Sequence, residues 1–299
     1  MKLSSKLAAK VSIGVLASLI SALASAEMTA ALPSDTPSPI LKFTIVGTDS
    51  GINWASADIG LSLDRSSGDF SLASPYAFSA GRRVTVDGVE LPAFVVKVDP
   101  TDSQGNRVFD RVTGGNVDPF MSYAYSITNN TSGALAVSAY FTSPIIPAVN
   151  GQANTVSARA SGILVDATGN GASLTYSPGT ASFQSFALSS MVNAPQGDAS
   201  FVNAGVDVGD QKSIAAGAPG SMAFINTVES GVVTGPQGVW NTMQMYAHFT
   251  LSGSGDIALV TGYGEIIPVP EPSDLAFMLS GLVVTASMMT RRRRASANR

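Results

Sequence analysis

Short segments of alternating apolar and polar residues follow one another through most of the chain, separated by turns rich in Gly, Asn, Asp and Pro. The clearest segment is Trp240–Leu251. A side-chain period of two is typical of a strand with one face on the core and the other in water. In this segment Met243, Met245, Ala247, Phe249 and Leu251 share one face, and Thr242, Gln244, Tyr246, His248 and Thr250 share the other.

The same pattern elsewhere predicts an all-β body over residues 40–267, preceded by a lead-in segment at 27–39. Asp87-Gly88 between two alternating segments predicts a hairpin. Ala158, Ala160 and Gly162 share one face of another segment, which predicts close approach of a facing sheet. We therefore expect a jelly-roll-like β-sandwich. Its predicted strands include residues 40–46, 51–63, 83–86, 89–98, 107–112, 121–128, 135–141, 156–165, 240–251 and 257–263.

An apolar stretch near the beginning of the chain, residues 11–23, does not alternate. Three lysines, Lys2, Lys6 and Lys10, precede it, and the small residues Ala24 and Ala26 follow it with Ser25 between them. This order is typical of a signal peptide, so we expect residues 1–26 to form a signal helix that signal peptidase removes after Ala26. The alternative is an uncleaved N-terminal anchor.

A second apolar stretch, residues 275–290, carries no charge and follows Asp274. At about 1.5 Å per residue a helix of this length reaches roughly 24 Å, slightly less than a bilayer core of about 30 Å. Arginines are costly in lipid and favour the cytoplasmic side, so the helix should cross the membrane with the body exported. A permanent single-span anchor and a buried core helix are the alternatives. The arginines are Arg291, Arg292, Arg293 and Arg294.

The residues before this stretch are Val269, Pro270, Glu271 and Pro272. The motif, the apolar stretch and the arginine cluster together resemble the PEP-CTERM sorting signal of Gram-negative bacteria, over residues 268–299. The resemblance implies an exosortase-type transpeptidase of the inner membrane that cuts at or near the motif. It also implies transient anchoring in the inner membrane, then delivery to the cell surface or outside, alongside exopolysaccharide and biofilm matrix. The four motif residues would then be read by another enzyme.

Charge is distributed unevenly between the ends and the body. Eight of the 17 basic residues lie in the two end segments, against two of the 21 acidic residues. The acidic body that remains argues against nucleic-acid binding, which needs clustered Lys and Arg. The chain has no cysteine and one histidine, which excludes disulfides and a His/Cys zinc site.

Catalytic patterns are hard to find. The single histidine is His248, and no Gly-x-Ser-x-Gly motif accompanies it. A glycosidase needs two acids close together in space, and the candidate acids lie in no recognisable motif. They are Asp58 with Asp64, Asp207 with Asp210, Glu229 and Glu265. We expect no enzyme. A carbohydrate-binding or carbohydrate-cleaving sandwich remains the alternative, because aromatic rings can stack on sugars. The candidate rings are Trp54, Tyr76, Tyr123, Tyr125, Trp240 and Tyr246.

One turn has the oxygen-rich pattern of a calcium loop. Asp166, Thr168 and Asn170 alternate before Gly171. Calcium loops place oxygen ligands in this way, but Ser177 stands where the acidic twelfth ligand would be. Ordinary β-turn chemistry explains the same residues. Calcium is therefore the one cofactor that the sequence suggests. A second oxygen-rich loop, without the calcium-loop spacing, contains Asp99, Asp102, Asn106 and Asp110.

Overall fold

The computed structural model of the chain describes residues 31–47, 51–79, 83–86, 88–109, 112–149, 154–177, 180, 182–209, 211–225 and 233–268. Within these ranges every regular element is a β-strand and all paired strands are antiparallel, which confirms the all-β prediction. No helix in the described ranges has the length and apolar character to cross a membrane. The predicted signal helix and the predicted membrane helix at 275–290 both lie outside the described residues.

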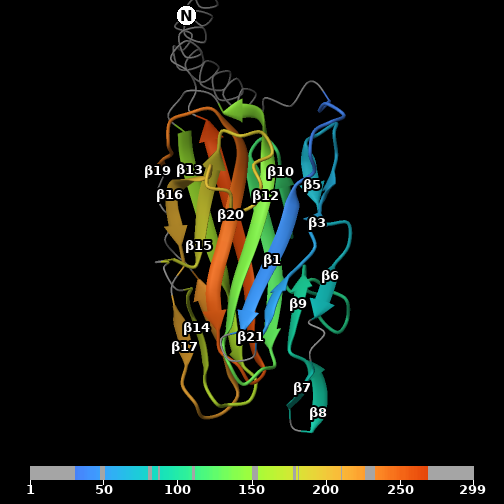
Figure 1. Cartoon of the computed structure of the whole chain (residues 1–299), viewed down its shortest axis with the longest axis vertical. Coiled ribbons are helices and arrows are strands. Elements are labelled where there is room, and N and C mark those ends of the chain that lie inside the picture. Colours follow the sequence, from blue (N-terminus) through green and yellow to red (C-terminus); the bar gives the residue numbers. More distant parts are fainter. Residues whose placement is uncertain are drawn as a thin grey trace, which may run out of the picture.

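The first sheet, sheet A, has nine strands and lies at the front of Figure 1. Its long central strands, β20 and β12, run side by side along the length of the molecule. The main path is β16 (Val202–Val208), β15 (Gln184–Ser189), β20 (Trp240–Leu251), β12 (Leu135–Val149), β1 (Ile40–Gly47) and β2 (Asn53–Ala55). The other strands of sheet A are β14 (Ala172–Tyr176), β17 (Lys212–Ile214) and β3 (Ile59–Gly60).

The second sheet, sheet B, has ten strands, and a separate hairpin extends from one end of the molecule (Figure 1). The main path of sheet B is β18 (Gly220–Ile225), β13 (Asn154–Asp166), β21 (Asp256–Pro268), β11 (Phe120–Asn129), β10 (Gly114–Asn116), β5 (Asp69–Ser71) and β4 (Ser62–Leu63). Its other strands are β19 (Val233–Thr234), β6 (Tyr76–Ser79) and β9 (Phe94–Val98). The hairpin joins β7 (Arg83–Val86) to β8 (Val89–Pro92), as predicted around Gly88.

The two sheets pack face to face around one apolar core. Phe43 of sheet A meets Tyr125 of sheet B edge to face, with ring centroids 5.1 Å apart. Sheet B approaches closely at Gly264, where a Cβ atom would lie 2.7 Å from the Phe186 ring of sheet A. Gly264 pairs with Ala158 of β13, and Ala158 and Ala160 are each 1% exposed, so these small residues lie in the core. Close approach of the facing sheet along β13 itself stays a prediction. A β-sandwich is therefore the architecture, and its jelly-roll-like character remains a prediction.

The strands with clean alternation were predicted well, and Trp240–Leu251 has the same bounds in the structure. Its polar face, however, is not in water: Thr242, Gln244 and His248 are each at most 4% exposed. Residues 190–200 explain part of this burial, because the main-chain oxygen of Met191 accepts a hydrogen bond from Thr242 Oγ1. A connecting segment therefore covers one end of a face that the sequence assigned to solvent.

Three strand predictions were wrong. Residues 89–98 are divided between β8 of the separate hairpin and β9 of sheet B. Residues 107–112 form no strand in their described part, where Arg107 makes an isolated bridge to Thr101. Residues 51–63 form three short strands, β2, β3 and β4, instead of one. The lead-in segment packs on the body where it is described: Leu32 is 7% exposed, and its amide donates to the main-chain oxygen of Arg65.

Candidate functional site

The predicted processing sites lie outside the described residues. This applies to the signal-cleavage residues Ala24 and Ala26, and to all residues of the predicted sorting tail after Pro268. Their roles stay predictions. The sorting motif Val269, Pro270, Glu271 and Pro272 and the cluster Arg291, Arg292, Arg293 and Arg294 belong to this group.

The predicted calcium turn follows β13, and hydrogen bonds organise it. Asp166 is fully buried, and its Oδ1 accepts from the amides of Thr168 and Gly169 at 3.2 and 2.7 Å. Its Oδ2 accepts from the amide of Gly171 at 2.8 Å. The Thr168 hydroxyl donates to Oδ1 of Asn170. These contacts are turn chemistry, and calcium binding at these residues stays a prediction.

The other predicted carboxylates have local partners. Asp102 accepts hydrogen bonds from the amides of Gln104 and Asn106 and from the Asn106 side chain, which lower its pKa. Asp64 accepts from the amide and hydroxyl of Ser66. Asp58 forms an ion pair with Lys42. Asp110 and Asp210 lie outside the described residues.

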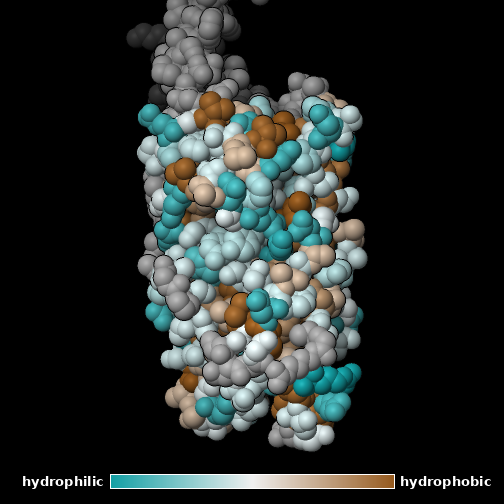
Figure 2. Space-filling view, in the orientation of Figure 1, coloured by the Kyte–Doolittle hydropathy of each residue, from teal (hydrophilic) through white to brown (hydrophobic). Residues whose placement is uncertain are grey.

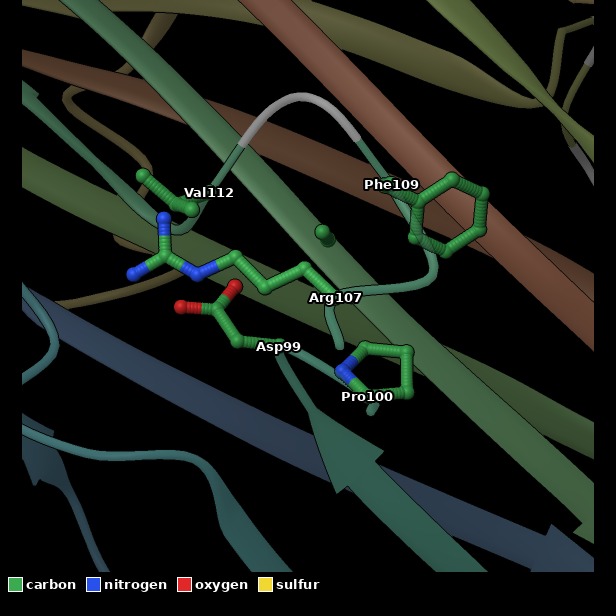
Figure 3. A pocket seen from close by; sticks show the side chains of 6 residues that line it. Asp99, Pro100, Arg107, Phe109 and Val112 are labelled. Carbon is green, nitrogen blue, oxygen red and sulfur yellow. The ribbon is translucent and has the colours of Figure 1, made fainter. Parts of the chain in front are cut away.

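A small hollow lies beside the loop that follows β9 (Figure 3). Its interior leaves no space for a water molecule, whereas small-molecule sites have volumes of roughly 300–1,000 Å³. Asp99 and Arg107 point toward one another across it (Figure 3). Asp99 Oδ1 accepts from both the amide and the hydroxyl of Thr113 at 2.8 Å. We therefore interpret Asp99 as an anchor of this loop, with no room for a ligand beside it.

His248 lies on β20 and is 4% exposed. Neither of its ring nitrogens has a hydrogen-bond partner among the described residues. Burial lowers the pKa of His248, against the opposing effects of the Ser182 main chain and the Asp207 carboxylate. Its ring meets Tyr246 edge to face, with centroids 4.3 Å apart. A neutral imidazole packed against a tyrosine does not form a catalytic triad with any described residue.

The outer face of sheet A carries the most distinctive set of functional groups, which we call the tyrosine row. It runs across five neighbouring strands, β1, β12, β20, β15 and β16, at one register position. Side chains at paired positions share one face of a sheet, so these residues lie side by side. The tyrosine row consists of Lys42, Tyr140, Tyr246, Ser185 and Asp207.

Two tyrosines form the centre of the row. The rings of Tyr140 and Tyr246 stack with centroids 4.4 Å apart and an angle of 14° between their planes. Burial, together with the neighbouring Tyr246 hydroxyl, raises the pKa of Tyr140. Other groups also contact the two rings: His248 packs against Tyr246, and a Cβ atom on Gly197 would lie 3.4 Å from Cε1 of Tyr140. The pair therefore combines apolar ring surface with hydroxyl groups.

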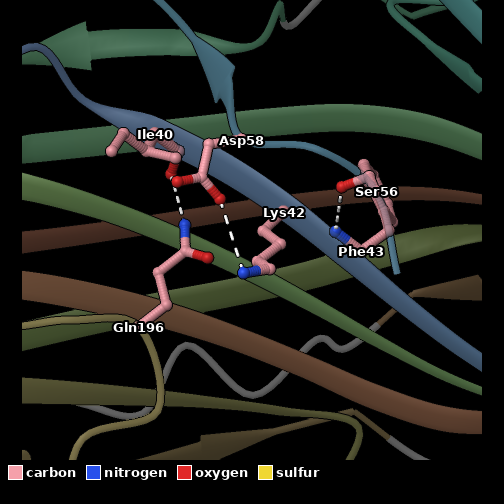
Figure 4. A network of polar contacts seen from close by, with 6 residues as sticks. All are labelled: Ile40, Lys42, Phe43, Ser56, Asp58 and Gln196. Carbon is pink, nitrogen blue, oxygen red and sulfur yellow. Dashed lines mark hydrogen bonds and ion pairs between the residues drawn. The ribbon is translucent and has the colours of Figure 1, made fainter. Parts of the chain in front are cut away.

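Charged groups and a connecting segment frame the row. Lys42 Nζ lies 3.5 Å from Asp58 Oδ1 at the β1 side (Figure 4). Beside it, Gln196 donates to the main-chain oxygen of Ile40 and holds residues 190–200 over the sheet (Figure 4). Asp207 accepts from the Asn203 side chain at the opposite side. Figure 2 shows this face as mainly hydrophilic to neutral, with hydrophobic residues in small separate groups.

The sequence did not single out Tyr140, Lys42 or the row as a whole. Among the aromatic residues that it did single out, Tyr123 and Tyr125 are buried in the core, at 1% and 0% exposure. Trp54 stacks on Phe78 at 4.8 Å, which makes it a packing residue. The row depends on the register of five strands, and no local sequence pattern encodes that register.

Comparisons with known proteins find little. No family model matches the chain, and no curated protein matches it significantly. Among solved structures, the enzymatically active domain of tailspike protein 4 from bacteriophage CBA120 is similar at 11% identity and a TM-score of 0.22, over 66% of this chain and 19% of the tailspike chain. A structure of infectious bursal disease virus, Gx strain, is similar at 12% identity and a TM-score of 0.15, over 82% of this chain and 59% of the viral chain. At these values neither likeness says anything about function.

Proposed function

We propose that the chain is an exported, non-enzymatic β-sandwich protein of the cell surface or extracellular matrix, sorted through residues 268–299 by an exosortase-type enzyme. The observation that carries the proposal is the order of the motif Val269 to Pro272, the apolar stretch 275–290 and the arginines 291–294. Signal peptidase and the inner membrane are its expected transient partners. Exopolysaccharide is its expected neighbour after export.

The position where β21 ends supports processing at the sorting motif. Strand β21 ends at Pro268, which pairs with Asn154 of β13. The motif begins at the next residue. Prolines hold a segment extended and remove amide donors, so a segment with Pro270 and Pro272 is poorly suited to a strand ladder. Cleavage at the motif would therefore leave both sheets of the sandwich complete.

Alanine replacement of Pro270, Glu271 and Pro272 together tests the proposal in the producing bacterium. The replaced protein should accumulate as a full-length form in the inner membrane, whereas Ser273→Ala should be processed normally. Mass spectrometry of the C-terminus of the exported protein provides the readout. Unchanged release of the alanine variant would refute sorting by the motif. An exported body that retains Arg299 would instead indicate a permanently tail-anchored periplasmic protein.

The tyrosine row favours a second candidate function, carbohydrate binding. Tyrosine rings with neighbouring amide, hydroxyl and carboxylate groups are suited to the mixed apolar and polar faces of sugars. Binding of the protein to the exopolysaccharide of its own strain tests this, with a Tyr140→Ala and Tyr246→Ala double variant. Tyr76→Ala is the matched control, because Tyr76 is 46% exposed and belongs to sheet B. Equal binding by the double variant and by Tyr76→Ala would exclude the tyrosine row as the binding site.

A further inference from the structure

Two buried carboxylates, Asp166 and Asp256, lie at adjacent ends of β13 and β21. Val165 of β13 pairs with Ile257 of β21, so Asp166 and Asp256 are the next residues along each strand. Both share the core-facing side of Leu164 and Ala258, which are fully buried. Asp166 and Asp256 are themselves 0% exposed.

The two carboxylates differ in their hydrogen bonds. Asp166 Oδ1 accepts from two main-chain amides of its own turn and Oδ2 accepts from one, which leaves Oδ2 one further acceptor position. Asp256 Oδ2 accepts one hydrogen bond, from the hydroxyl of Ser252. Asp256 Oδ1 is buried and has no partner among the described residues. A buried acceptor without a partner is costly, and the cost is larger for a charged group beside a second carboxylate.

The turn that carries Asp256 also lies against the predicted calcium turn. A Cβ atom on Gly255 would be 3.6 Å from Cγ2 of Thr168. The amide of Gly255 donates to the main-chain oxygen of Asn129, and Asn129 pairs with Asp256 on the other side. The fold therefore brings a second carboxylate to Asp166 from about ninety positions further along the chain. Asp256 is thus an acid beside the turn, although the sequence pattern lacks an acid at its twelfth position.

We propose that Asp166 and Asp256 together bind one divalent cation, with Asp256 Oδ1 as a ligand. The oxygen-only surroundings favour calcium, which accepts six to eight oxygen ligands from carboxylates, carbonyls and water. The cation neutralises the repulsion between the two carboxylates and gives the free oxygen a partner. A calcium loop would have an acidic ligand at the position of Ser177, and here Asp256 takes that role. The ligands therefore come from two strands rather than from one loop.

Calorimetric titration of the full-length protein, purified from the producing cells in detergent and treated with chelator, tests the site. We expect one calcium ion per chain, with a dissociation constant of about 10⁻⁴–10⁻³ M, as in extracellular modules. Asp256→Asn keeps the shape and the acceptor for Ser252, and should weaken binding at least tenfold. Asp102→Asn removes an exposed turn carboxylate and should leave binding unchanged.

Thermal unfolding of the same proteins with calcium or with chelator provides the second readout. Calcium should raise the melting temperature of the natural protein and of Asp102→Asn, but not that of Asp256→Asn. Absence of stoichiometric calcium binding, or equal binding by Asp256→Asn, would overturn the site. A proton on Asp256 would then explain how its buried carboxyl group is tolerated. If Asp256→Asn does not fold, Asp166→Asn tests the same ion through its other carboxylate.

Discussion

The hydroxyl of Tyr123 on β11 donates a hydrogen bond across the core to Oε1 of Gln184 on β15. The amide nitrogen of Gln184 continues the link to the main-chain oxygens of Arg159 and Tyr263, at 3.3 and 3.4 Å. Gln184 is 0% exposed. Burial raises the pKa of Tyr123 far above its usual range, so the hydroxyl remains a donor. One polar side chain of sheet A therefore bonds to three groups of sheet B inside an apolar core.

Removal of this link should destabilise the protein more than a surface change does. Gln184→Leu leaves the Tyr123 hydroxyl buried without an acceptor, at a cost of about 1–3 kcal/mol per stranded polar group. Tyr123→Phe with Gln184→Leu should recover part of the loss, because both partners are then apolar. Urea unfolding of both single variants and of the double variant measures the coupling. Strictly additive losses would show that the two side chains act independently.

Space for the link depends on Gly262. A Cβ atom at this position would collide with both the Tyr123 ring and Gln184 Oε1. Gly262→Ala should therefore lower the free energy of unfolding by about 3 kcal/mol or more, as overpacking of a dense core does. Gly60→Ala is the control, since a Cβ atom there meets nothing within 4 Å. Similar denaturation midpoints for the two variants would contradict the close packing of Gly262 against Tyr123 and Gln184.

Asp256 should make stability depend on pH when calcium is absent. Burial raises its pKa from 3.8 to about 6, the charge of Asp166 adds to this, and the Ser252 hydrogen bond opposes it. Between pH 4 and 6 the folded chain keeps a proton that the unfolded chain has lost, so stability falls as the pH rises through this window. A pKa of about 6 corresponds to a loss of at most about 3 kcal/mol above pH 6, which solvent screening reduces.

The difference in unfolding free energy between Asp256→Asn and the natural protein, measured with chelator, isolates this effect. It should be small at pH 4 and should grow in favour of Asp256→Asn up to pH 7. His248 titrates in both proteins, so its contribution cancels in the difference. A difference that does not change with pH would show that Asp256 is already ionised at pH 4.

Asn129 should be a main stabiliser of the same end of the molecule. It is 0% exposed, and its Nδ2 donates to the main-chain oxygens of Gly133, Leu251 and Ser252. Its Oδ1 accepts from the amide and hydroxyl of Thr131. Asn129→Ala strands these groups and should cost about 3–5 kcal/mol.

Asn106→Ala is the counterpart of Asn129→Ala on the surface, because Asn106 is exposed and its side chain donates to Asp102. Its cost should stay below about 1 kcal/mol, as for an exposed hydrogen bond. Chemical unfolding of both variants gives the comparison. An equal loss of unfolding free energy in the two variants would mean that the turn at Asn129 does not depend on the Asn129 side chain.

Local periodicity was sufficient for the long strands. Trp240–Leu251 and the core-facing side of β11 were predicted because each alternates without interruption, and Met121 and Ile127 are indeed fully buried. Residues 107–112 were misread as a strand. Asp99, which precedes this segment, has a φ of 50° and accepts hydrogen bonds from Thr113, which follows it, so a long-range contact links the two sides of the segment.

Long-range pairing could not be predicted in the same way. The sequence places Asp166 in a turn, but nothing local indicates that Asp256 lies beside it. The stacked Tyr140 and Tyr246 likewise depend on a register between β12 and β20. Register is set by the whole sheet and by its turns. Residues with the most distinctive surroundings are therefore those whose neighbours come from distant strands.

Strand β21 lies between two partners, pairing with β11 from Phe120 to Asn129 and with β13 from Asn154 to Val165. A pulling force applied at Pro268 along the strand would load both ladders in shear, so that many hydrogen bonds have to break together rather than one after another. If the protein is held to a surface through residues that follow Pro268, its point of attachment is thus among the mechanically strongest strands of the fold.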